Sequence, residues 1–174
     1  MADGIEFTVV VDREDLDKAL AMMTPEGMDF PGMFAMMADD FYASEALIFA
    51  SEGANRGGRW DPNSPGYAAI KKSNWGDVPV LQLTGALVRS MTMKGSTGGV
   101  LDIQPLEMTV GTSLPYADKH QRGSTEDMWV PYPYMMMMAG VPARPFLWFE
   151  EADRARWEKI ANDWLTTIVA KMGS

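Results

Sequence analysis

Asp118 and His120 come closest, by residue type and spacing, to a catalytic pair. His120 is the only histidine among the 174 residues, so a Ser-His-Asp arrangement or a histidine-rich metal site would have to include it. Residues two positions apart on a helix point in different directions, so these two do not form an obvious dyad. A structural histidine, hydrogen-bonded near the end of a short helix, is the favoured interpretation, and a small hydrolase using Asp118 and His120 is the alternative.

Residue patterns that other enzymatic chemistry needs are missing from the sequence. The chain has no cysteine, which excludes disulfides, thiolate catalysis and cysteine-ligated zinc. No Gly-Lys-Ser or Gly-Lys-Thr occurs, and Gly53, Gly57 and Gly58 follow an expected helix instead of a strand, so no nucleotide-binding loop is indicated. We therefore expect no enzyme, no cofactor and no metal site. Adjacent carboxylates are typical of solvated faces or helix starts, and they are Asp39-Asp40, Glu126-Asp127 and Glu150-Glu151.

The chain is acidic, with a formal net charge of -9. Such a surface repels phosphates, so sequence-specific nucleic-acid binding is not expected, although an acidic lumen would let DNA pass without sticking. The N-terminus lacks a basic segment followed by an apolar stretch, which argues against a signal peptide. The most apolar segment, Met33–Ala50, contains three acidic residues, which argues against a membrane span. We expect a chain that folds in the cytoplasm.

Hydrophobic periodicity predicts a strand and two helices in the first third of the chain. Apolar and polar residues alternate from Ile5 to Val11, as in a strand. A short helix is expected from the N-cap residue Asp12 to Met23, because Pro25 and Gly27 would end it. The longer helix is expected over about residues 31–51.

This longer helix is apolar over most of its girth, which indicates that it packs on more than its own sheet. Burial in the core and packing against a neighbouring subunit both remain open. Its main stripe is Phe34, Met37, Ala38, Phe41 and Ile48, widened by Met36, Tyr42, Leu47 and Phe49, with a polar side of Asp39, Asp40, Ser44 and Glu45.

Residues 52–77 predict an irregular loop, because glycines, prolines and asparagines occur throughout. Trp60, Tyr67 and Trp75 would be costly to leave in water, so we expect them to fix this loop and to offer a contact surface. Long loops without secondary structure are usually functional or disordered, and the aromatic residues favour function.

The second half of the chain predicts further short elements and a final amphipathic helix. Thr84 is expected to cap a short helix that ends at Ser90, and a strand is expected over Met91–Lys94. Two more strands are expected over Val100–Gln104 and Leu106–Thr112. The last helix begins near Glu150, with an apolar stripe of Trp157, Ile160, Trp164, Leu165 and Ile168.

These elements together predict an α+β fold. A small antiparallel sheet would pack against the long N-terminal helix and the C-terminal amphipathic helix. The chain shows no internal repeat and no dividing linker, so we expect a single domain over residues 1–174. Within it, residues 122–141 form an insert rich in methionine, tyrosine and proline.

Four segments occur in a fixed order and carry the most information. Pro79–Met91 is an apolar run that contains a Thr-Gly helix start, and Val110–Thr112 is followed by Tyr116–Gly123. Val141–Leu147 then leads into the final helix. In content and order these segments, with Trp60 and Pro62 upstream, resemble the phage virion morphogenesis family, the tail-completion proteins of tailed phages. The resemblance covers about residues 45–172; Trp148, where the family often has glycine, and the insert depart from it.

The resemblance implies a structural virion protein and not an enzyme. Copies would close into a ring, a hexamer, at the head-proximal end of the tail or in the neck, where the ring terminates the tail tube and joins it to the head-tail connector. The implied partners are further copies of the chain, the tail tube protein and the connector. A head-closure or adaptor protein of the neck is a near alternative, and a scaffold or chaperone that leaves the finished particle is another.

Under this resemblance the motif residues mainly determine the fold, and Arg144 is the exception. Its guanidinium could fork onto a carboxylate of its own chain, which is favoured, or of a neighbouring subunit. Met135–Met138 follow Pro131–Tyr134, and four consecutive methionines cannot all face one core. An exposed apolar segment marks a contact site, whereas a strand buried on both faces is the alternative. The predicted interface residues are Trp60, Tyr67, Trp75, Tyr132, Tyr134, Met135, Met136, Met137, Met138 and Arg144.

Overall fold

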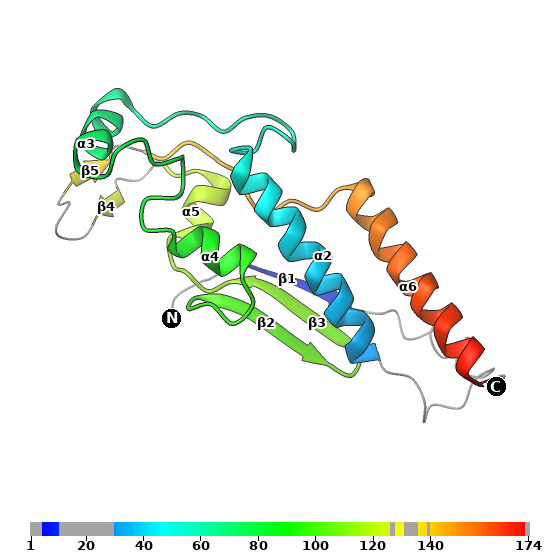
Figure 1. The fold of residues 1–174 in the computed structure, drawn as a ribbon. Coiled ribbons are helices and arrows are strands. Elements are labelled where there is room, and N and C mark those ends of the chain that lie inside the picture. The colour runs from blue at the N-terminus through cyan, green and yellow to red at the C-terminus, as the bar shows by residue number, and fades with distance from the viewer. Residues whose placement is uncertain (1–4, 11–29, 126–127, 131–135, 139, 173–174) are drawn as a thin grey trace. The chain divides into compact units, whose positions relative to one another are not determined.

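The computed structural model describes residues 5–10, 30–125, 128–130, 136–138 and 140–172. The described residues form an α+β fold, as the sequence predicts (Figure 1). In chain order its elements are β1 (Ile5–Val10), α2 (Phe30–Ala50), α3 (Pro65–Trp75), α4 (Ala86–Thr92), β2 (Gly99–Gln104), β3 (Glu107–Thr112), α5 (Ala117–Arg122), β4 (Met128–Val130), β5 (Met136–Met138) and α6 (Glu151–Met172).

The chain divides into two compact units, each assembled from three separate stretches of sequence. Unit 1 comprises Met1–Glu6, Tyr42–Val100 and Gly111–Trp148. Unit 2 comprises Phe7–Phe41, Leu101–Val110 and Phe149–Ser174. Because neither unit is a continuous stretch, no composition shift along the sequence marks this division. The single domain over residues 1–174 stays a prediction.

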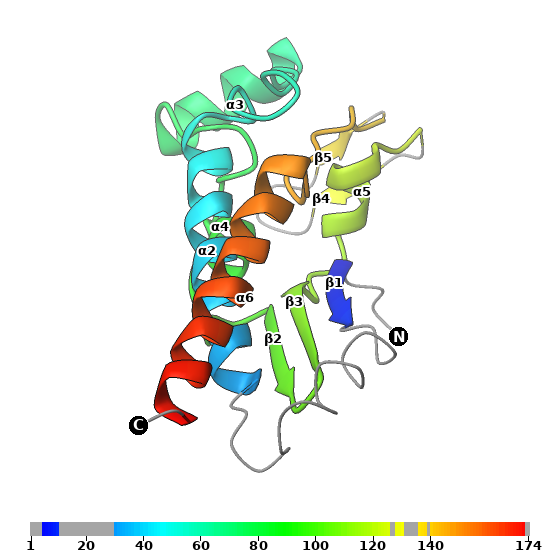
Figure 2. The ribbon, with the colours of Figure 1, turned by 90° about the vertical axis from the view of Figure 1, so that its right-hand side faces the viewer.

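The larger sheet has three strands in the order β1-β3-β2, and Figure 2 shows them side by side. Only Pro105 and Leu106 separate β2 from β3, and so short a connection requires an antiparallel hairpin. A Cβ on Gly111 would meet Ile5, whereas the Thr109 and Thr8 hydroxyls are hydrogen-bonded at 3.1 Å. Partner numbers thus fall along β3 as they rise along β1, so this pair is antiparallel too. These strands confirm the predicted antiparallel sheet.

The second sheet is the antiparallel β4–β5 hairpin, which lies in unit 1. In its register Met128 faces Met138, Trp129 faces Met137 and Val130 faces Met136. The base of this hairpin continues into a bridge in which Ser124 and Val141 exchange both backbone hydrogen bonds. The methionine run therefore contributes a strand.

Helix α2 confirms the predicted long helix and separates its apolar residues into two groups. Phe34, Ala38 and Ile48 have no exposed surface, whereas Met36 and Leu47 are 43% and 63% exposed. Glu45, which was expected on the polar side, is instead 1% exposed. Glu45 lies on the same face as the buried Phe41 and Tyr42 one turn before it and the buried Ile48 and Phe49 one turn after it, so the wide stripe carries it into the interior. The other buried apolar residues of α2 are Phe30, Met33, Met37, Phe41, Tyr42 and Phe49.

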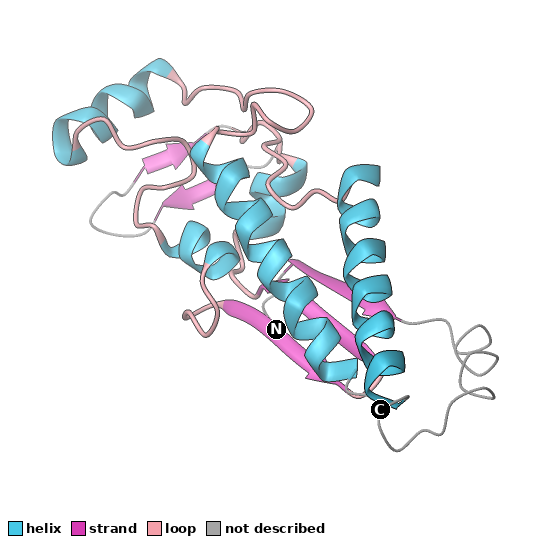
Figure 3. Ribbon diagram, turned by 45° about the vertical axis from the view of Figure 1, so that its right-hand side comes forward, coloured by secondary structure: helices cyan, strands magenta, loops and turns pink. Residues whose placement is uncertain are grey.

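In unit 2 the first half of α2 packs against α6, as Figure 3 shows. The rings of Phe30 and Trp164 are 5.0 Å apart. The Asp40 carboxylate accepts hydrogen bonds from Arg156 Nε at 2.9 Å and from Trp157 Nε1 at 3.0 Å. The predicted stripe of α6 is confirmed, with Trp157, Trp164 and Ile168 buried and with Ile160 and Leu165 half-buried.

Three predictions of local structure were wrong or cannot be compared. The loop predicted over residues 52–77 contains α3, which begins at Pro65, because proline is well tolerated in the first turn of a helix. No strand forms over Met91–Lys94, since α4 runs on to Thr92 and Met91 is completely buried on the face of Leu87. The helix predicted from Asp12 lies outside the described residues.

Candidate functional site

Three residues from other parts of unit 1 meet around one extended segment, Arg144–Leu147, which we call the clamped segment. Five of its backbone amide and carbonyl groups are hydrogen-bonded to Trp60, His120 or Gln121. The Arg144 amide donates to the carbonyl of His120 at 2.7 Å. The Pro145 carbonyl accepts a hydrogen bond from Trp60 Nε1, also at 2.7 Å. The clamped segment is therefore fixed although it lies in no helix or strand.

Gln121 of α5 makes the largest single contribution to this clamp. Its Oε1 accepts the amides of Phe146 and Leu147, each at 3.0 Å. Its Nε2 donates to the Leu147 carbonyl at 2.7 Å. One amide side chain thereby imitates the edge of a strand, because it satisfies donors and an acceptor of the same backbone. The segment Tyr116–Gly123 was identified in the sequence as a motif, but the hydrogen bonds of Gln121 to a backbone 25 residues away were not predicted.

Arg144 is internal to unit 1, with 2% of its surface exposed. Its Nε donates to the Asp61 carbonyl at 2.8 Å and its Nη2 to the Pro62 carbonyl at 3.0 Å. Arg144 thus binds within its own chain, as favoured, but its guanidinium donates to two backbone carbonyls and not to a carboxylate. These carbonyls follow the buried Trp60 and need a donor, which the fixed guanidinium geometry supplies. Burial lowers the pKa of Arg144, whereas the nearby Asp61 raises it.

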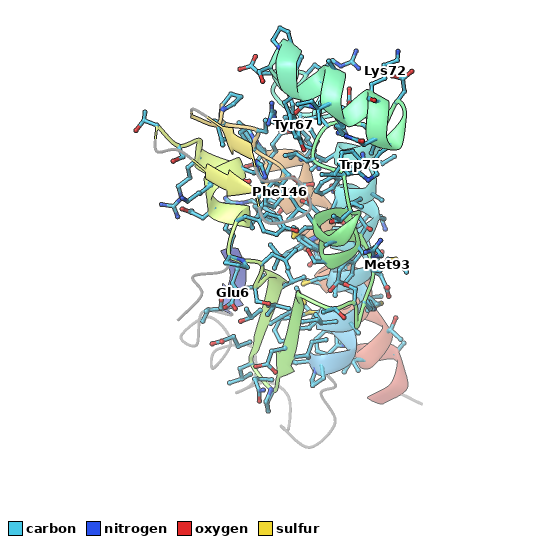
Figure 4. The ribbon with its side chains drawn as sticks, turned by 90° about the vertical axis from the view of Figure 1, so that its left-hand side faces the viewer. Glu6, Tyr67, Lys72, Trp75, Met93 and Phe146 are labelled. Atoms are coloured by element: carbon cyan, nitrogen blue, oxygen red, sulfur yellow. The ribbon has the colours of Figure 1, made fainter. Side chains whose placement is uncertain are left out.

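An aromatic cluster packs on the clamped segment through Phe146, which is labelled in Figure 4. The ring of Phe49 lies 5.5 Å from that of Trp60 and 5.9 Å from that of Phe146, and all three residues are buried. A Cβ on Gly53 would lie 2.6 Å from the Trp60 indole nitrogen, so only glycine leaves room there. Aromatic pairs at such distances stabilise beyond their buried area. Trp60 therefore fixes its loop, as the sequence predicts.

His120 lies in α5 with its ring edge-on to Tyr116, at a centroid distance of 5.9 Å. Burial, and then the positive charge of Arg144, lower its pKa to about 4. Its Nδ1 is buried and has no hydrogen-bond partner within the described part of the chain. The predicted hydrogen bond of the histidine ring is therefore not formed at this nitrogen. Asp118 pairs with Arg122 at 2.7 Å. The two residues thus do not form the pair that a hydrolase would need.

Glu52 and Lys71 fix the two loops on either side of α3. Glu52 Oε1 accepts the Val80 amide at 2.8 Å, and its Oε2 pairs with Arg59. These bonds, led by the one to Arg59, lower the pKa of Glu52. Lys71 is 4% exposed and donates to the Pro79 carbonyl at 2.7 Å, and burial lowers its pKa. Neither role could be predicted from the sequence, because both depend on contacts between segments that are distant from one another along the chain.

The predicted interface residues fall into three groups in the structure. Trp60 and Arg144 are inside unit 1, whereas Tyr67 and Trp75 are half-buried on α3 (Figure 4). Tyr132, Tyr134 and Met135 lie outside the described residues, and Met136, Met137 and Met138 form β5. For all ten residues, participation in an interface remains a prediction.

Exposed apolar side chains occur on both units, and most of them were not singled out by the sequence. On unit 1 they are Leu47, Ile70, Met93 and Trp148, and on unit 2 they are Val10, Met36, Leu106, Phe149 and Val169.

Among the described residues, no group of three or more histidine, cysteine or acidic side chains could hold a metal ion. None of the helices there has the length and apolar character that crossing a membrane requires.

Comparison with family models matches residues 11–166 to the phage virion morphogenesis family. Because the match covers most of the chain, the protein belongs to this family. Membership points to a role in phage virion structure or assembly. Searches of curated proteins and of solved structures found no match. Of the motifs that carry the resemblance, Tyr116–Gly123 and Val141–Leu147, together with Trp60, build the clamp, so these residues help to hold the fold of unit 1.

Proposed function

We propose that the protein is a ring-forming subunit at the head-proximal end of a phage tail or in the neck. The ring terminates the tail tube, docks on the head-tail connector and lets DNA pass through its centre. The match to the phage virion morphogenesis family over residues 11–166 carries this proposal. A role for surfaces is supported because motif residues are used internally to fix the clamped segment and because nine large apolar side chains of the described residues are exposed.

The β4–β5 hairpin supports self-association. All six of its residues are apolar, and neighbouring positions on a strand lie on opposite faces. Positions 129 and 137 therefore share one face, and positions 128, 130, 136 and 138 share the other. Whichever face packs on unit 1, the opposite face is apolar as well. We propose that a neighbouring subunit or the tail tube covers it.

Light scattering and negative-stain imaging of the purified protein, alone and with tail tubes that lack it, test this function. We expect rings in solution and a cap at one end of each tube. A protein that stays monomeric and never associates with tail ends would refute the proposal. Rings that bind isolated heads and leave tails bare would show a head-closure protein instead.

Substitutions on the two faces of β5 separate assembly from folding. Met136→Lys with Met138→Lys changes one face, and Met137→Lys changes the other. We expect one of these variants to remain a folded monomer that forms no rings, as judged by circular dichroism and light scattering. If both variants unfold, the hairpin is buried on both faces and this contact is not the one that assembles the ring.

A further inference from the structure

The three-stranded sheet has two open edges in the described part of the chain. In the order β1-β3-β2 only β3 has a strand on both sides, and Figure 2 shows β1 and β2 on opposite sides of it. An open edge presents unpaired amides and carbonyls, which proteins often protect with lysine, proline or a bulge. The residues of β2, Gly-Val-Leu-Asp-Ile-Gln, include no lysine, arginine or proline. This edge is therefore suited to pairing with another strand.

The register of the β2–β3 hairpin shows which backbone groups of β2 point outward. The Ser113 amide donates to the Gly98 carbonyl at 2.8 Å, so even-numbered residues on the β2 side bond to odd-numbered residues of β3. Successive residues of a strand direct their N–H and C=O groups to opposite sides, so the odd-numbered residues of β2 direct theirs away from β3. Leu101 and Ile103 thus hold two amides and two carbonyls at the edge, with no strand beside them among the described residues.

The same alternation identifies the outward groups of β1. Odd-numbered residues of β3 bond to β2, so the even-numbered ones bond to β1. Thr8 lies opposite Thr109, an odd-numbered residue, as the 3.1 Å hydrogen bond between their hydroxyls shows. Thr8, and with it Glu6 and Val10, therefore directs its amide and carbonyl away from β3. Strand β1 thus provides the second open edge.

We propose that β2 of one copy of this chain pairs with β1 of the next copy, so that the sheets of neighbouring subunits join into one. This inference rests on the proposed ring, which needs a heterologous contact between two different surfaces of the same subunit. Both β1 and β2 are antiparallel to β3, so they run parallel to each other. Neighbours in a ring of six differ by a rotation too small to reverse a strand, so β2 and the next copy's β1 also pair in parallel.

Charge selects the partner strand and its register. The one parallel register that matches all four outward groups of β2 with residues of β1 places Asp102 beside Thr8. Moving β1 by two residues would place Asp102 beside Glu6, and both carboxylates are exposed and repel each other. Pairing of β2 with another copy's β2 is unfavourable too, because the register that uses all four groups puts the two Asp102 side chains directly opposite each other.

Thr8→Pro tests the contact through one hydrogen bond. Proline is tolerated in an edge strand where its missing N–H would face outward, so the variant should fold like the wild type by circular dichroism. It lacks an amide that the contact uses, and we expect ring formation to need at least tenfold more protein, as measured by mass photometry. Thr8→Val keeps the amide and should assemble like the wild type. A folded Thr8→Pro variant with wild-type assembly would overturn the inference.

Cysteine cross-linking tests the register, because the chain has no cysteine of its own. In the variant Thr8→Cys with Asp102→Cys, the two positions of one copy lie on either side of β3, about 9–10 Å apart, beyond the reach of a disulfide. Positions paired across the contact lie about 5 Å apart, within its reach. Under mild oxidation we expect rings of this variant to yield a ladder of disulfide-linked multimers on denaturing electrophoresis without reductant.

Matched controls separate this contact from others. Thr8→Cys alone, Asp102→Cys alone and the out-of-register pair Thr8→Cys with Gln104→Cys should all stay unlinked. The inference is overturned if rings of the folded double variant give no cross-link, if Asp102→Cys alone gives linked dimers, or if the out-of-register pair links equally well. A wild-type protein that forms no rings would instead refute the proposed function itself.

Discussion

In unit 1, side chains of several loops converge on one extended segment, whereas in unit 2 two helices pack through aromatic rings and one ion-pair cluster. Gln121, Trp60 and the His120 carbonyl hold the backbone of the clamped segment in unit 1. In unit 2, Asp40 joins α2 to α6 through Arg156 and Trp157. The family-like loop motifs thus lie where backbone groups would otherwise lack partners, because loops, unlike helices, do not satisfy their own backbone.

The two units also differ in what they leave on the surface. Over the full sequence unit 1 has nine basic and nine acidic residues and carries the apolar β4–β5 hairpin, whereas unit 2 has six basic and fifteen acidic residues. The net negative charge of the chain therefore comes from unit 2 alone.

Replacement of Gln121 by leucine should have the largest effect. The change removes three hydrogen bonds and leaves two amides and one carbonyl of the clamped segment without a partner. At about 1–3 kcal/mol for each unsatisfied buried group, partly offset by water, we expect a loss of about 3–5 kcal/mol in the free energy of unfolding. Urea denaturation measures it. Gln121→Glu keeps the acceptor and should cost less; a loss below about 1 kcal/mol for Gln121→Leu would contradict the clamp.

Acid should weaken unit 1 through His120. The folded-state pKa of about 4 lies below the ordinary value of 6.5, so the unfolded chain binds the proton more tightly. Stability that is fully present above pH 6.5 is therefore lost as the pH falls toward 4, by about 3 kcal/mol at roughly 1.4 kcal/mol per pKa unit. Denaturation midpoints from pH 7 to pH 4 measure this loss, and His120→Gln should flatten the profile. Glu52, whose pKa is also lowered, adds a separate loss at lower pH.

Asp40→Asn tests the corresponding contact of unit 2. The amide keeps one acceptor oxygen but loses the negative charge that binds Arg156 and Trp157. Because Arg156 is partly exposed, we expect a loss of only about 1–2 kcal/mol. Urea denaturation with hydrogen exchange of α6 measures it, and Glu158→Gln on the same helix is the control. If Asp40→Asn lowered the free energy of unfolding as much as Gln121→Leu does, the expected difference in energy between the contacts of the two units would be contradicted.

Leu47→Lys should have the smallest effect on stability. Leu47 is 63% exposed, so its replacement should change the free energy of unfolding by no more than about 0.5 kcal/mol. Ile48→Lys, at the completely buried neighbouring position, should unfold the protein. Thermal melts of the two variants measure the contrast. Equal destabilisation would show that the exposed side of α2 is covered in the isolated chain.

Periodic patterns allowed the sequence to predict the elements better than the contacts between them. The alternation around Met108 and Val110 and the stripe of Trp157, Trp164 and Ile168 predicted β3 and α6, because local periodicity reflects burial. Helix α3 was missed because the glycines and prolines around it are typical of loops. The motifs identified the family, yet they did not predict that Gln121 and Arg144 bind distant backbone.

The concentration of net negative charge in unit 2 was not predictable from the sequence, because the stretches that form each unit alternate along the chain. Neither Met93 nor Leu106 stood out, since exposure of a single apolar residue depends on the fold around it. The same limit applies to His120, where the sequence could name the residue but not the burial that lowers its pKa.

Light scattering with negative-stain imaging of the purified protein, alone and with tail tubes that lack it, tests most directly whether the protein acts as a ring-forming subunit. The account predicts rings in solution and a cap at one end of each tube. A folded protein that stays monomeric and never associates with tail ends would contradict it.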